Sequence, residues 1–325
     1  MSGAVGSTKR FLRQYYRDVR QLLAQERQLR RHGMAYYNFW ELPPVPATWF
    51  YRFLQRPALR PLHGRQRVGF FSVFGRRRLV DWARCDRRIF FTGENLARFP
   101  AYHDHLLDRV DLALGFDHLD HPRYLRFPLW LLECFDPLAT HADLVRQLAA
   151  TAGGAAGEEA PRRHFAMLIA RHDRSGLRAA VGDVVGEFGE VCYPAAFRFN
   201  DRAPLAPGWE AKLKYLRTAR YNICPENAAR PGYVTEKLFH ATMAGCVPIY
   251  WGGDRRPEPD VLRAEAMLFY DPQRPDDLRQ QLRQLVADER CFEGFRRQPR
   301  FQATAADRIY GYYTTLEQQL LKLLS

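Results

Sequence analysis

Short apolar runs that each stop at a glycine or a polar residue recur along this chain and alternate with helix-like segments. In the first half of the sequence these runs are "RVGFFSVFG" (67–75), "RRIFFTGEN" (87–95) and "VDLALGFD" (110–117). Runs of this kind are typical of buried strands that end at a turn. Strands that alternate with helices form parallel sheets with right-handed crossover connections. The pattern therefore predicts an α/β fold.

A change in composition at "AATAGGAAGEEA" (149–160), followed by Pro161, separates these runs from a second series. Small residues of this kind predict a linker or a surface connection. Beyond it come "HFAMLIA", "GEVCYP", "RYNICPEN", "CVPIYWG" and "AMLFYD". Because 325 residues exceed the usual size of one hydrophobic core, we expect two domains. They are an N-terminal domain over 1–150 and, after a linker over 151–161, a C-terminal domain over 162–325 whose last helix can pack back on the first domain.

The chain is strongly basic. Its formal net charge is +13, and all but five of its 49 Lys and Arg side chains are arginines. A basic balance suits a polyanionic partner, namely nucleic acid, an anionic membrane surface or a nucleotide-diphosphate substrate. No nucleic-acid-binding motif accompanies the arginines, so we expect no nucleic-acid partner. Residues 1–35 predict a peripheral basic helix whose 8–31 segment either associates with an anionic membrane or, as we favour, is simply solvated.

The cysteine pattern and the hydropathy bear on the compartment. The six cysteines are scattered, with no Cys-x-x-Cys pair and no zinc-like spacing, which favours free thiols in a reducing compartment. No apolar stretch has the length of a bilayer span, and the first thirty residues lack the apolar region of a signal peptide. We therefore expect a cytoplasmic protein. The alternative for the basic helix adds peripheral association with the inner membrane.

The segment "YVTEKLFHATMAGCVPIYWGG" (233–253) predicts a short helix followed by a hydrophobic strand. Thr235 is placed as the N-cap of that helix. A helix N-terminus that follows a strand favours phosphate, because its free N–H groups and its dipole attract negative charge. Lys237 in the first turn opposes the dipole unless an anion offsets it. The alternative is that Lys237 extends into solvent and Glu236 is an ordinary first-turn acid.

Directly upstream, the run "RYNICPEN" ends in Glu226 and Asn227 and continues into a loop rich in proline and glycine. In doubly wound sheets, ligands bind beyond the carboxyl ends of the strands. We therefore expect one crevice that offers donors to a phosphate and acceptors to sugar or ribose hydroxyls. The side chains expected to gather there are Glu226, Asn227, Tyr233, Glu236 and Lys237.

The whole block "YNICPENAARPGYVTEKLFHATMAGCVPIYWGG" (221–253) resembles the signature block of glycosyltransferase family 10, the α-1,3/4-fucosyltransferases. "RIFFTGEN" and "DLALGFDHLDHPRYLRFPLWLL" resemble the N-terminal blocks of bacterial members of that family. The resemblance implies the glycosyltransferase-B architecture, in which two Rossmann-like domains face a cleft. The N-terminal domain would bind the acceptor, and the C-terminal domain would bind GDP-fucose.

The resemblance also implies an activity. It predicts an inverting, metal-independent α-1,3-fucosyltransferase that moves L-fucose from GDP-β-L-fucose to the GlcNAc or Glc of a lactose-type or N-acetyllactosamine-type glycan, including lipopolysaccharide. The partners would be GDP-fucose and a glycan acceptor. An α-1,4 linkage or another nucleotide-sugar donor is the nearest alternative. A basic protein that binds polyanions or a membrane surface is the alternative from another class.

The family pattern assigns roles in the donor pocket. Lys237 and an arginine upstream of the signature block would neutralise the diphosphate. We expect this arginine to be Arg198 in "AAFRFND", with Arg202 as its competitor. The other candidates for the donor pocket all lie in the signature block: Glu226, Asn227, Tyr233, Thr235 and Glu236.

Glu94 in "TGEN" matches the proposed general base of the family. It follows an apolar run, where a glycine turn can direct a carboxylate toward an acceptor hydroxyl and take its proton. The alternative is an ordinary glutamate of a surface turn. Asp117 and His118 in the next strand-end loop are further candidates for acceptor contact.

The sequence contains no Asp-x-Asp pair, the usual carboxylate clamp for a divalent cation on a diphosphate. We therefore expect no required metal and no other cofactor, with a divalent metal at most stimulatory. Cations and a helix terminus would then stabilise the leaving group.

Overall fold

The computed structural model describes residues 2–151, 162–202, 204–206 and 208–325. The chain divides into two compact units. Unit 1 comprises Met1–Pro128, Asp136–Leu138 and Tyr312–Ser325, and unit 2 comprises Leu129–Phe135 and Ala139–Gly311. In the described parts of the chain, no helix combines the length and the apolar character that a bilayer span requires.

This division differs from the predicted boundary at residue 150. Helix α5 (His141–Thr151) belongs to unit 2. Helix α11 (Ala305–Leu324) is shared, since unit 1 takes the chain again from Tyr312. Nearly all of the predicted linker, residues 152–161, lies outside the described residues.

Unit 1 is built on a five-stranded parallel sheet in the order β1-β2-β3-β4-β5. Its strands are β1 (Met34–Tyr37), β2 (Val68–Phe71), β3 (Arg87–Phe91), β4 (Leu112–Gly115) and β5 (Tyr124–Arg126). Its helices are α1 (Ser2–His32), α2 (Trp49–Phe53) and α3 (Arg78–Trp82), with 3-10 turns η1 (Val45–Ala47), η2 (Arg60–Leu62), η3 (Leu96–Arg98) and η4 (Pro100–Tyr102).

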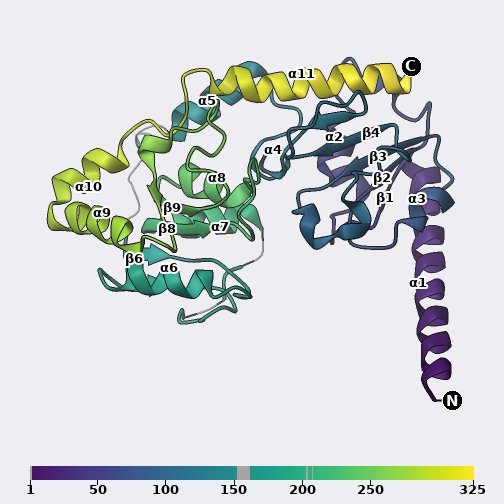
Figure 1. Ribbon diagram of the computed structural model, residues 1–325. Helices are drawn as coiled ribbons and strands as arrows, with labels where there is room; N and C mark the ends of the chain where they lie inside the picture. Colours follow the sequence, from purple (N-terminus) through teal and green to yellow (C-terminus); the bar gives the residue numbers. More distant parts are fainter. Residues whose placement is uncertain (1, 152–161, 203, 207) are drawn as a thin grey trace. The chain divides into compact units, whose positions relative to one another are not determined.

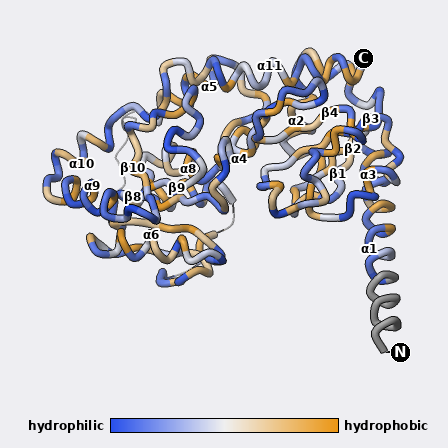
Figure 2. The backbone as a smooth tube through the Cα atoms, in the orientation of Figure 1, coloured by the Kyte–Doolittle hydropathy of each residue, from blue (hydrophilic) through white to orange (hydrophobic). Residues whose placement is uncertain are grey.

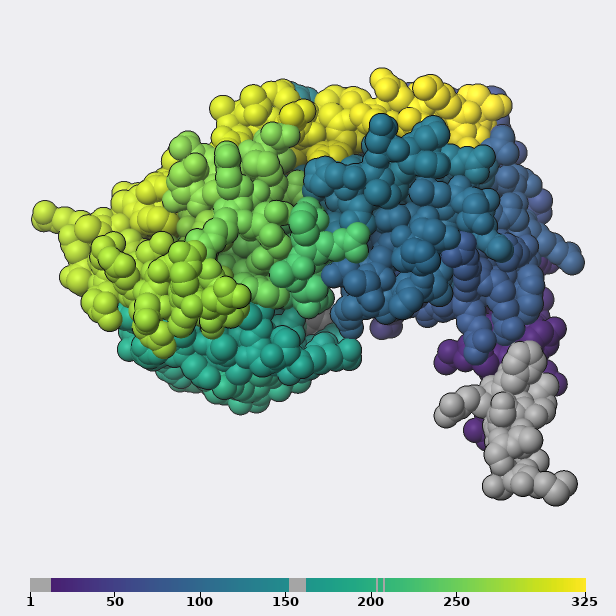
Figure 3. Space-filling view, viewed as in Figure 1, coloured from purple at the N-terminus to yellow at the C-terminus, as the bar shows by residue number. Residues whose placement is uncertain are grey.

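Both faces of this sheet are covered, so its strands are apolar on both sides. One face packs Tyr37, Phe71 and Phe90 into a core that also includes Leu29 of α1. On the other face, Phe70 stacks on Phe50 of α2 with ring centroids 4.5 Å apart. The C-terminal part of α11 belongs to this unit, and Figure 3 shows its residues in yellow against the blue residues of unit 1.

Unit 2 is built on a second five-stranded parallel sheet, in the order β10-β9-β8-β6-β7. Its strands are β6 (His164–Met167), β7 (Val191–Cys192), β8 (Ala219–Pro225), β9 (Val247–Trp251) and β10 (Leu268–Phe269). Its other elements, besides α5 and the start of α11, are α4 (Leu129–Cys134), α6 (Leu177–Gly186), α7 (Trp209–Leu216), α8 (Glu236–Met243), η5 (Ala264–Ala266), α9 (Pro275–Ala287) and α10 (Glu289–Arg296).

Helices cover both faces of the second sheet, and Figure 1 shows α6 and α8 on opposite sides of its strands. Alternate residues of β6 divide between two cores, because side chains of a strand point to opposite faces. Ala166 packs with apolar residues of α6 and α9, whereas Met167 packs with Leu213 and Leu216 of α7. Figure 2 shows the hydrophobic colour of α6 and the more hydrophilic colour of the outer helices α9 and α10.

The strand order of unit 2 contains a topological switch point. From β6 the chain crosses to β7 on one side and then returns to β8 on the other side. The carboxyl ends of β6 and β8 are therefore neighbours whose following loops diverge, which is where doubly wound sheets bind their ligands. The predicted α/β fold with two parallel sheets is confirmed.

Candidate nucleotide-sugar site

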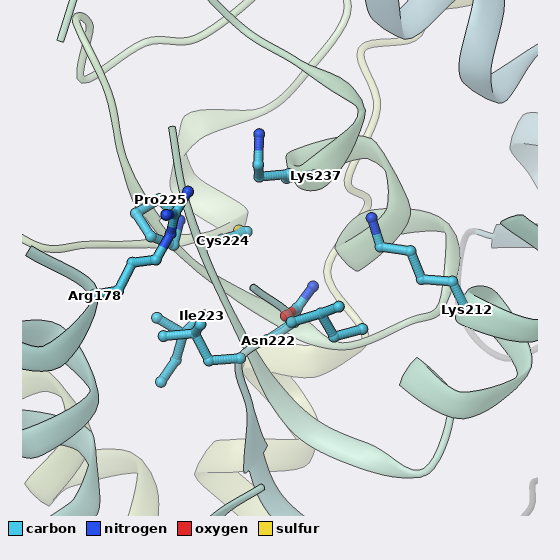
Figure 4. A pocket seen from close by; sticks show the side chains of 9 residues that line it. Arg178, Lys212, Asn222, Ile223, Cys224, Pro225 and Lys237 are labelled. Atoms are coloured by element: carbon cyan, nitrogen blue, oxygen red, sulfur yellow. The ribbon is translucent and has the colours of Figure 1, made fainter. Parts of the chain in front are cut away.

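A pocket lies in unit 2 at the carboxyl ends of β6 and β8 (Figure 4). Three helices each supply one cation to it: Arg178 from α6, Lys212 from α7 and Lys237 from α8. Figure 4 shows Arg178 and Lys212 reaching in from opposite sides of β8. The other lining residues end or follow the two strands: Leu168, Ile169, Asn222, Ile223, Cys224 and Pro225. Three convergent cations make the pocket suited to a polyanionic group such as a diphosphate.

Glu226 holds the start of α8 against the end of β8. Its buried carboxylate accepts hydrogen bonds from the backbone N–H and the hydroxyl of Thr235, both at 2.7 Å. It also accepts one from the Lys237 ammonium at 3.3 Å. Glu226 is only 2% exposed. Its carboxylate therefore holds the Lys237 ammonium from the buried side of the helix start.

Thr235 occupies the N-cap position of α8, as the sequence predicts, but its hydroxyl does not cap the helix. The hydroxyl instead donates to Glu226. The Thr235 side chain therefore leaves the first amide groups of α8 uncapped, and the positive end of the helix dipole faces the same region as Lys237.

The charges of Lys237 and Glu236 stabilise each other. Burial alone would favour the neutral amine, but the carboxylates of Glu226 and Glu236 hold the pKa of Lys237 above its ordinary value. Burial likewise opposes the ionisation of Glu236, yet Lys237 and Lys212 lower its pKa to about 2. Lys212 lies 3.8 Å from the Glu236 carboxylate. Both side chains at the helix start are therefore ionised at neutral pH.

Arg178 is a site residue that the sequence analysis missed. It is the second residue of α6 and donates a hydrogen bond to the Oδ1 atom of Asn227 at 2.8 Å. The signal was present, because Arg178 is a cation in the first turn of a helix after a strand, the same unfavourable place that Lys237 has in α8. Asn222, a buried amide in β8, and Lys212 were missed as well.

Arg198 and Arg202, the arginines expected from the sequence, are not among the residues that line this pocket. The Arg198 guanidinium forms an ion pair with Asp183, an exposed residue of α6. Arg202 is exposed in the following loop, where its backbone N–H donates to Asp201 at 2.7 Å. In this geometry the cation that accompanies Lys237 is Arg178.

The loop that connects β8 to α8 is fixed at its far end too. The backbone N–H of Gly232 donates to Asp254 at 2.8 Å. A Cβ atom at Gly253 would lie 2.1 Å from the backbone of Arg230, so only glycine permits this approach. Tyr233, predicted to line the donor pocket, is 2% exposed within this loop. Asn227 remains exposed and meets Arg178.

In unit 1, Glu94 follows the carboxyl end of β3, as the sequence predicts. Its backbone N–H donates to the hydroxyl of Thr92 at 3.0 Å, which fixes the turn. Its side chain is 28% exposed and lies 3.9 Å from the Arg98 guanidinium. Its Oε2 atom has no hydrogen-bond partner among the described residues. The turn after β3 therefore fixes the backbone of Glu94, and Arg98 is the cation nearest to its carboxylate.

The two other acceptor candidates differ from each other. Asp117 is buried, and its carboxylate lies 3.1 Å from Nε2 of His105, which is also buried. His118 is exposed. The structure thus places Asp117 in an internal pair, whereas His118 stays accessible. Among the described residues, no three His, Cys, Asp or Glu side chains are grouped to hold a metal ion.

Two family models match the chain. The model of the "Alpha-(1,3)-fucosyltransferase FucT N-terminal domain" matches residues 34–133, and that of "Glycosyltransferase family 10 (fucosyltransferase) C-term" matches residues 208–309. Two parallel α/β units with a cationic pocket at the switch point of the second define the glycosyltransferase-B class of fold. The chain belongs to glycosyltransferase family 10, the fucosyltransferase family.

Individual relatives agree with this assignment. The α-(1,3)-fucosyltransferase FucT of Helicobacter pylori is 26% identical over 254 residues, which are 67% of this chain and 50% of that protein. The α-(1,3)-fucosyltransferase B of Drosophila melanogaster is 30% identical over 84 residues, 26% of this chain and 19% of that protein. The match therefore spans at most half the length of these curated relatives.

A solved structure shares the fold. The crystal structure of an α1,3-fucosyltransferase with GDP-fucose aligns with a TM-score of 0.54 and 20% sequence identity, covering 88% of this chain and 90% of the other.

Proposed function

We propose that this protein is an α-1,3-fucosyltransferase that uses GDP-β-L-fucose as its donor. The observation that carries the proposal is the convergence of Arg178, Lys212 and Lys237 on one pocket at the switch point of unit 2. The solved relative with the same fold was crystallised with GDP-fucose, and a diphosphate is the part of that donor that three cations would bind. Each charge-assisted contact contributes roughly 1.5–3 kcal/mol.

In the proposed reaction, an acceptor hydroxyl attacks the anomeric carbon of fucose from the face opposite GDP. A new C–O glycosidic bond forms, the bond from that carbon to the diphosphate oxygen breaks, and the hydroxyl proton passes to the Glu94 carboxylate. One displacement inverts the anomeric configuration. The departing GDP carries the developing negative charge, which Arg178, Lys237 and the start of α8 stabilise. No divalent metal is required in this scheme.

The remaining donor contacts follow from the chemistry of the side chains around the pocket. The ionised Glu236 accepts hydrogen bonds from ribose or fucose hydroxyls, and the exposed Asn227 amide adds a further donor. Tyr233 contributes through its place in the loop between β8 and α8. Glu226 and Thr235 act indirectly, because they hold Lys237 and the helix start in position.

We propose a neutral glycan of the lactose or N-acetyllactosamine type as the acceptor, with lipopolysaccharide as the natural carrier of such a glycan. The basic helix α1 suits a membrane-bound carrier. Arg13, Arg17, Arg20 and Arg27 are exposed on this helix, and an arginine-rich helix face associates with anionic lipid. Co-sedimentation with anionic and with neutral vesicles tests this extension, which equal binding to both would overturn.

The activity is tested with GDP-fucose against lactose, N-acetyllactosamine and lacto-N-biose, followed by linkage analysis of each product. A fucosylated product with an α-1,3 bond to Glc or GlcNAc supports the proposal. A thermal-shift panel with GDP, GDP-fucose, GDP-mannose and UDP-sugars tests the donor. Stabilisation by UDP-sugars but not by GDP would overturn the donor assignment, and an α-1,4 product would overturn the linkage. The same transfer with excess EDTA tests the proposed metal independence.

A further inference from the structure

Three aromatic side chains lie at the carboxyl edge of the first sheet, in the loops that follow β1, β2 and β3. Trp40 comes three residues after the end of β1, and Phe74 comes three residues after the end of β2. Because Tyr37 pairs with Phe71 in the sheet register, Trp40 and Phe74 occupy equivalent positions. Phe99 comes from the loop after β3, which also carries Glu94. We call Trp40, Phe74 and Phe99 the aromatic platform.

The Phe74 ring contacts both of the other rings. The Trp40 and Phe74 rings are packed edge to face, with centroids 6.1 Å apart and planes at 89°. Phe74 and Phe99 are packed in the same way, at 5.5 Å and 77°. Trp40 is anchored on the buried ring of Phe91 in β3, at 6.1 Å. The platform is therefore continuous with the core of unit 1.

The backbone beneath the platform is locked. Asn38 adopts a left-handed conformation (φ 58°) that few side chains tolerate. Its carbonyl accepts a hydrogen bond from the backbone N–H of Phe74 at 2.9 Å, and its buried amide donates to the carbonyl of Arg76 at 3.0 Å. A Cβ atom at Gly75 would lie 1.8 Å from the Asn38 side chain. The loops after β1 and β2 thus form one rigid unit that fixes Trp40 relative to Phe74.

Packing inside unit 1 does not explain why Phe74 remains 45% exposed at such a rigid place. An aromatic surface in contact with water is unfavourable, so its burial under a ligand contributes to binding. Because the rings are already fixed, they lose no further conformational freedom when the ligand binds. The same edge of the sheet carries the Glu94 carboxylate and the Arg98 guanidinium, 3.9 Å apart. An aromatic face next to an acceptor and a donor of hydrogen bonds matches a pyranose, which has an apolar C–H face and a rim of hydroxyls.

We propose that the aromatic platform binds the acceptor sugar by stacking, so that a hydroxyl of the stacked ring is presented to Glu94. This inference rests on the proposed function, since it names the surface that selects the acceptor of that reaction. It predicts a preference for neutral pyranosides that carry several axial C–H bonds on one face, such as β-glucosides, β-N-acetylglucosaminides and β-galactosides. The nucleotide of the donor would not contact the platform.

The test is steady-state transfer at saturating GDP-fucose with the acceptor concentration varied. Phe74→Ala should raise the acceptor KM about three- to tenfold, in line with the loss of one aromatic contact. It should leave the KM for GDP-fucose and the GDP-induced thermal shift within about twofold of wild type. Phe74→Tyr keeps the ring and should restore the acceptor KM. Tyr16→Ala, which removes a 65% exposed ring from α1, is the matched control and should change none of these values.

Failure of the proposed function and failure of the platform give different results. If the wild-type protein transfers no fucose, the proposed function fails. If it transfers fucose and Phe74→Ala leaves the acceptor KM unchanged, the platform is refuted. If Phe74→Ala raises only the KM for GDP-fucose, the rings contact the donor nucleotide, and the proposed acceptor platform is refuted as well. Saturation-transfer NMR of wild-type protein with lactose needs no variant: saturation confined to the protons of one sugar face is expected, and even saturation of both faces contradicts stacking.

Discussion

The guanidinium of Arg178 donates a hydrogen bond to Oδ1 of Asn227 at 2.8 Å and so joins two residues that are 49 positions apart in the sequence. The contact links the first turn of α6 with the loop after β8, one on each side of the switch point in unit 2. Burial lowers the pKa of Arg178, yet the ordinary value of an arginine is so high that the side chain stays cationic at neutral pH. The exposed Asn227 amide thus orients a permanent charge toward the pocket.

Arg178→Ala should weaken GDP binding by about 10- to 100-fold, because one charge-assisted contact to the diphosphate is lost. Arg198→Ala is the matched control from the same unit, and it should change GDP affinity by less than about threefold because Arg198 is paired with Asp183. Isothermal titration of GDP into each purified variant measures both. A larger loss for Arg198→Ala would restore Arg198 as the diphosphate-binding arginine.

Glu94→Gln should lower kcat by about 100-fold or more and leave GDP affinity near wild type, because the amide cannot take the proton of the acceptor hydroxyl. Asp108→Asn removes the charge of an exposed carboxylate that precedes β4, at the opposite edge of the sheet, and should leave kcat unchanged. Initial rates at saturating donor and acceptor provide the measurement. Parallel losses of GDP binding and turnover would remove Glu94 from the role of base.

Lys237→Ala should both weaken GDP binding, by about 10-fold or more, and destabilise the protein. The stability loss has a separate cause, since the buried Glu226 carboxylate loses the ammonium 3.3 Å away. Removal of one partner of a buried pair costs up to about 3–5 kcal/mol, and less here because the Lys237 side chain is 20% exposed.

The double variant Lys237→Ala with Glu226→Gln separates these two effects. The neutral amide no longer needs a cation and can still accept from Thr235, so most of the lost stability should return while GDP binding stays weak. Urea denaturation and GDP titration of the single and double variants measure the two quantities independently. Recovery of GDP affinity in the double variant would show that Lys237 acts on the fold and not on the diphosphate.

Glu133 of α4 should make the protein less stable as the pH rises from about 5 to about 8. Burial, together with the neighbouring Glu236, raises the pKa of Glu133 to about 7, against the opposing effect of Lys212. A carboxyl whose pKa is raised in the folded state contributes stability below its unfolded value, near 4.3. That contribution to stability is lost as the pH rises from the unfolded-state pKa through the folded-state pKa of about 7.

Glu133→Gln removes this titration and should gain about 1–3 kcal/mol over wild type at pH 8, with little difference at pH 5. Urea denaturation at pH values between 5 and 8.5 gives the two curves. The exposed Glu210→Gln of α7 is a control in the same unit and should run parallel to wild type. Parallel curves for Glu133→Gln would mean that the Glu133 carboxyl titrates normally.

Much of the fold was predictable from local pattern. Each of the eight apolar runs quoted from the sequence contains a strand, from β2 and β3 to β10. β1 and β5 were not predicted. β1 (four residues) follows helix α1 with only Gly33 between them, and β5 has three residues. The second is embedded in "RYLRF", where charged residues interrupt the pattern. A strand this short is stabilised by its neighbours in the sheet more than by its own composition.

The candidate site was predictable only where its residues are close to one another in the sequence. Glu226, Thr235 and Lys237 lie within eleven positions of each other and meet in the structure, because a single loop brings the end of a strand to the start of a helix. The roles assigned to these residues, to Glu94 and to Tyr233 stay predictions. Asp117 could not be judged from its loop, because its pairing with His105 depends on a side chain outside it.

The sequence by itself determined the parallel α/β architecture and the block from 221 to 253 that carries the family resemblance, since apolar alternation and motif spacing are properties of neighbouring positions. Only the tertiary structure decided that Arg178, and not Arg198, accompanies Lys237, and that α11 is divided between the two units. Those outcomes depend on which distant segments pack together. A charged side chain takes its place from the partners that packing brings within reach, and the linear order of residues does not specify them.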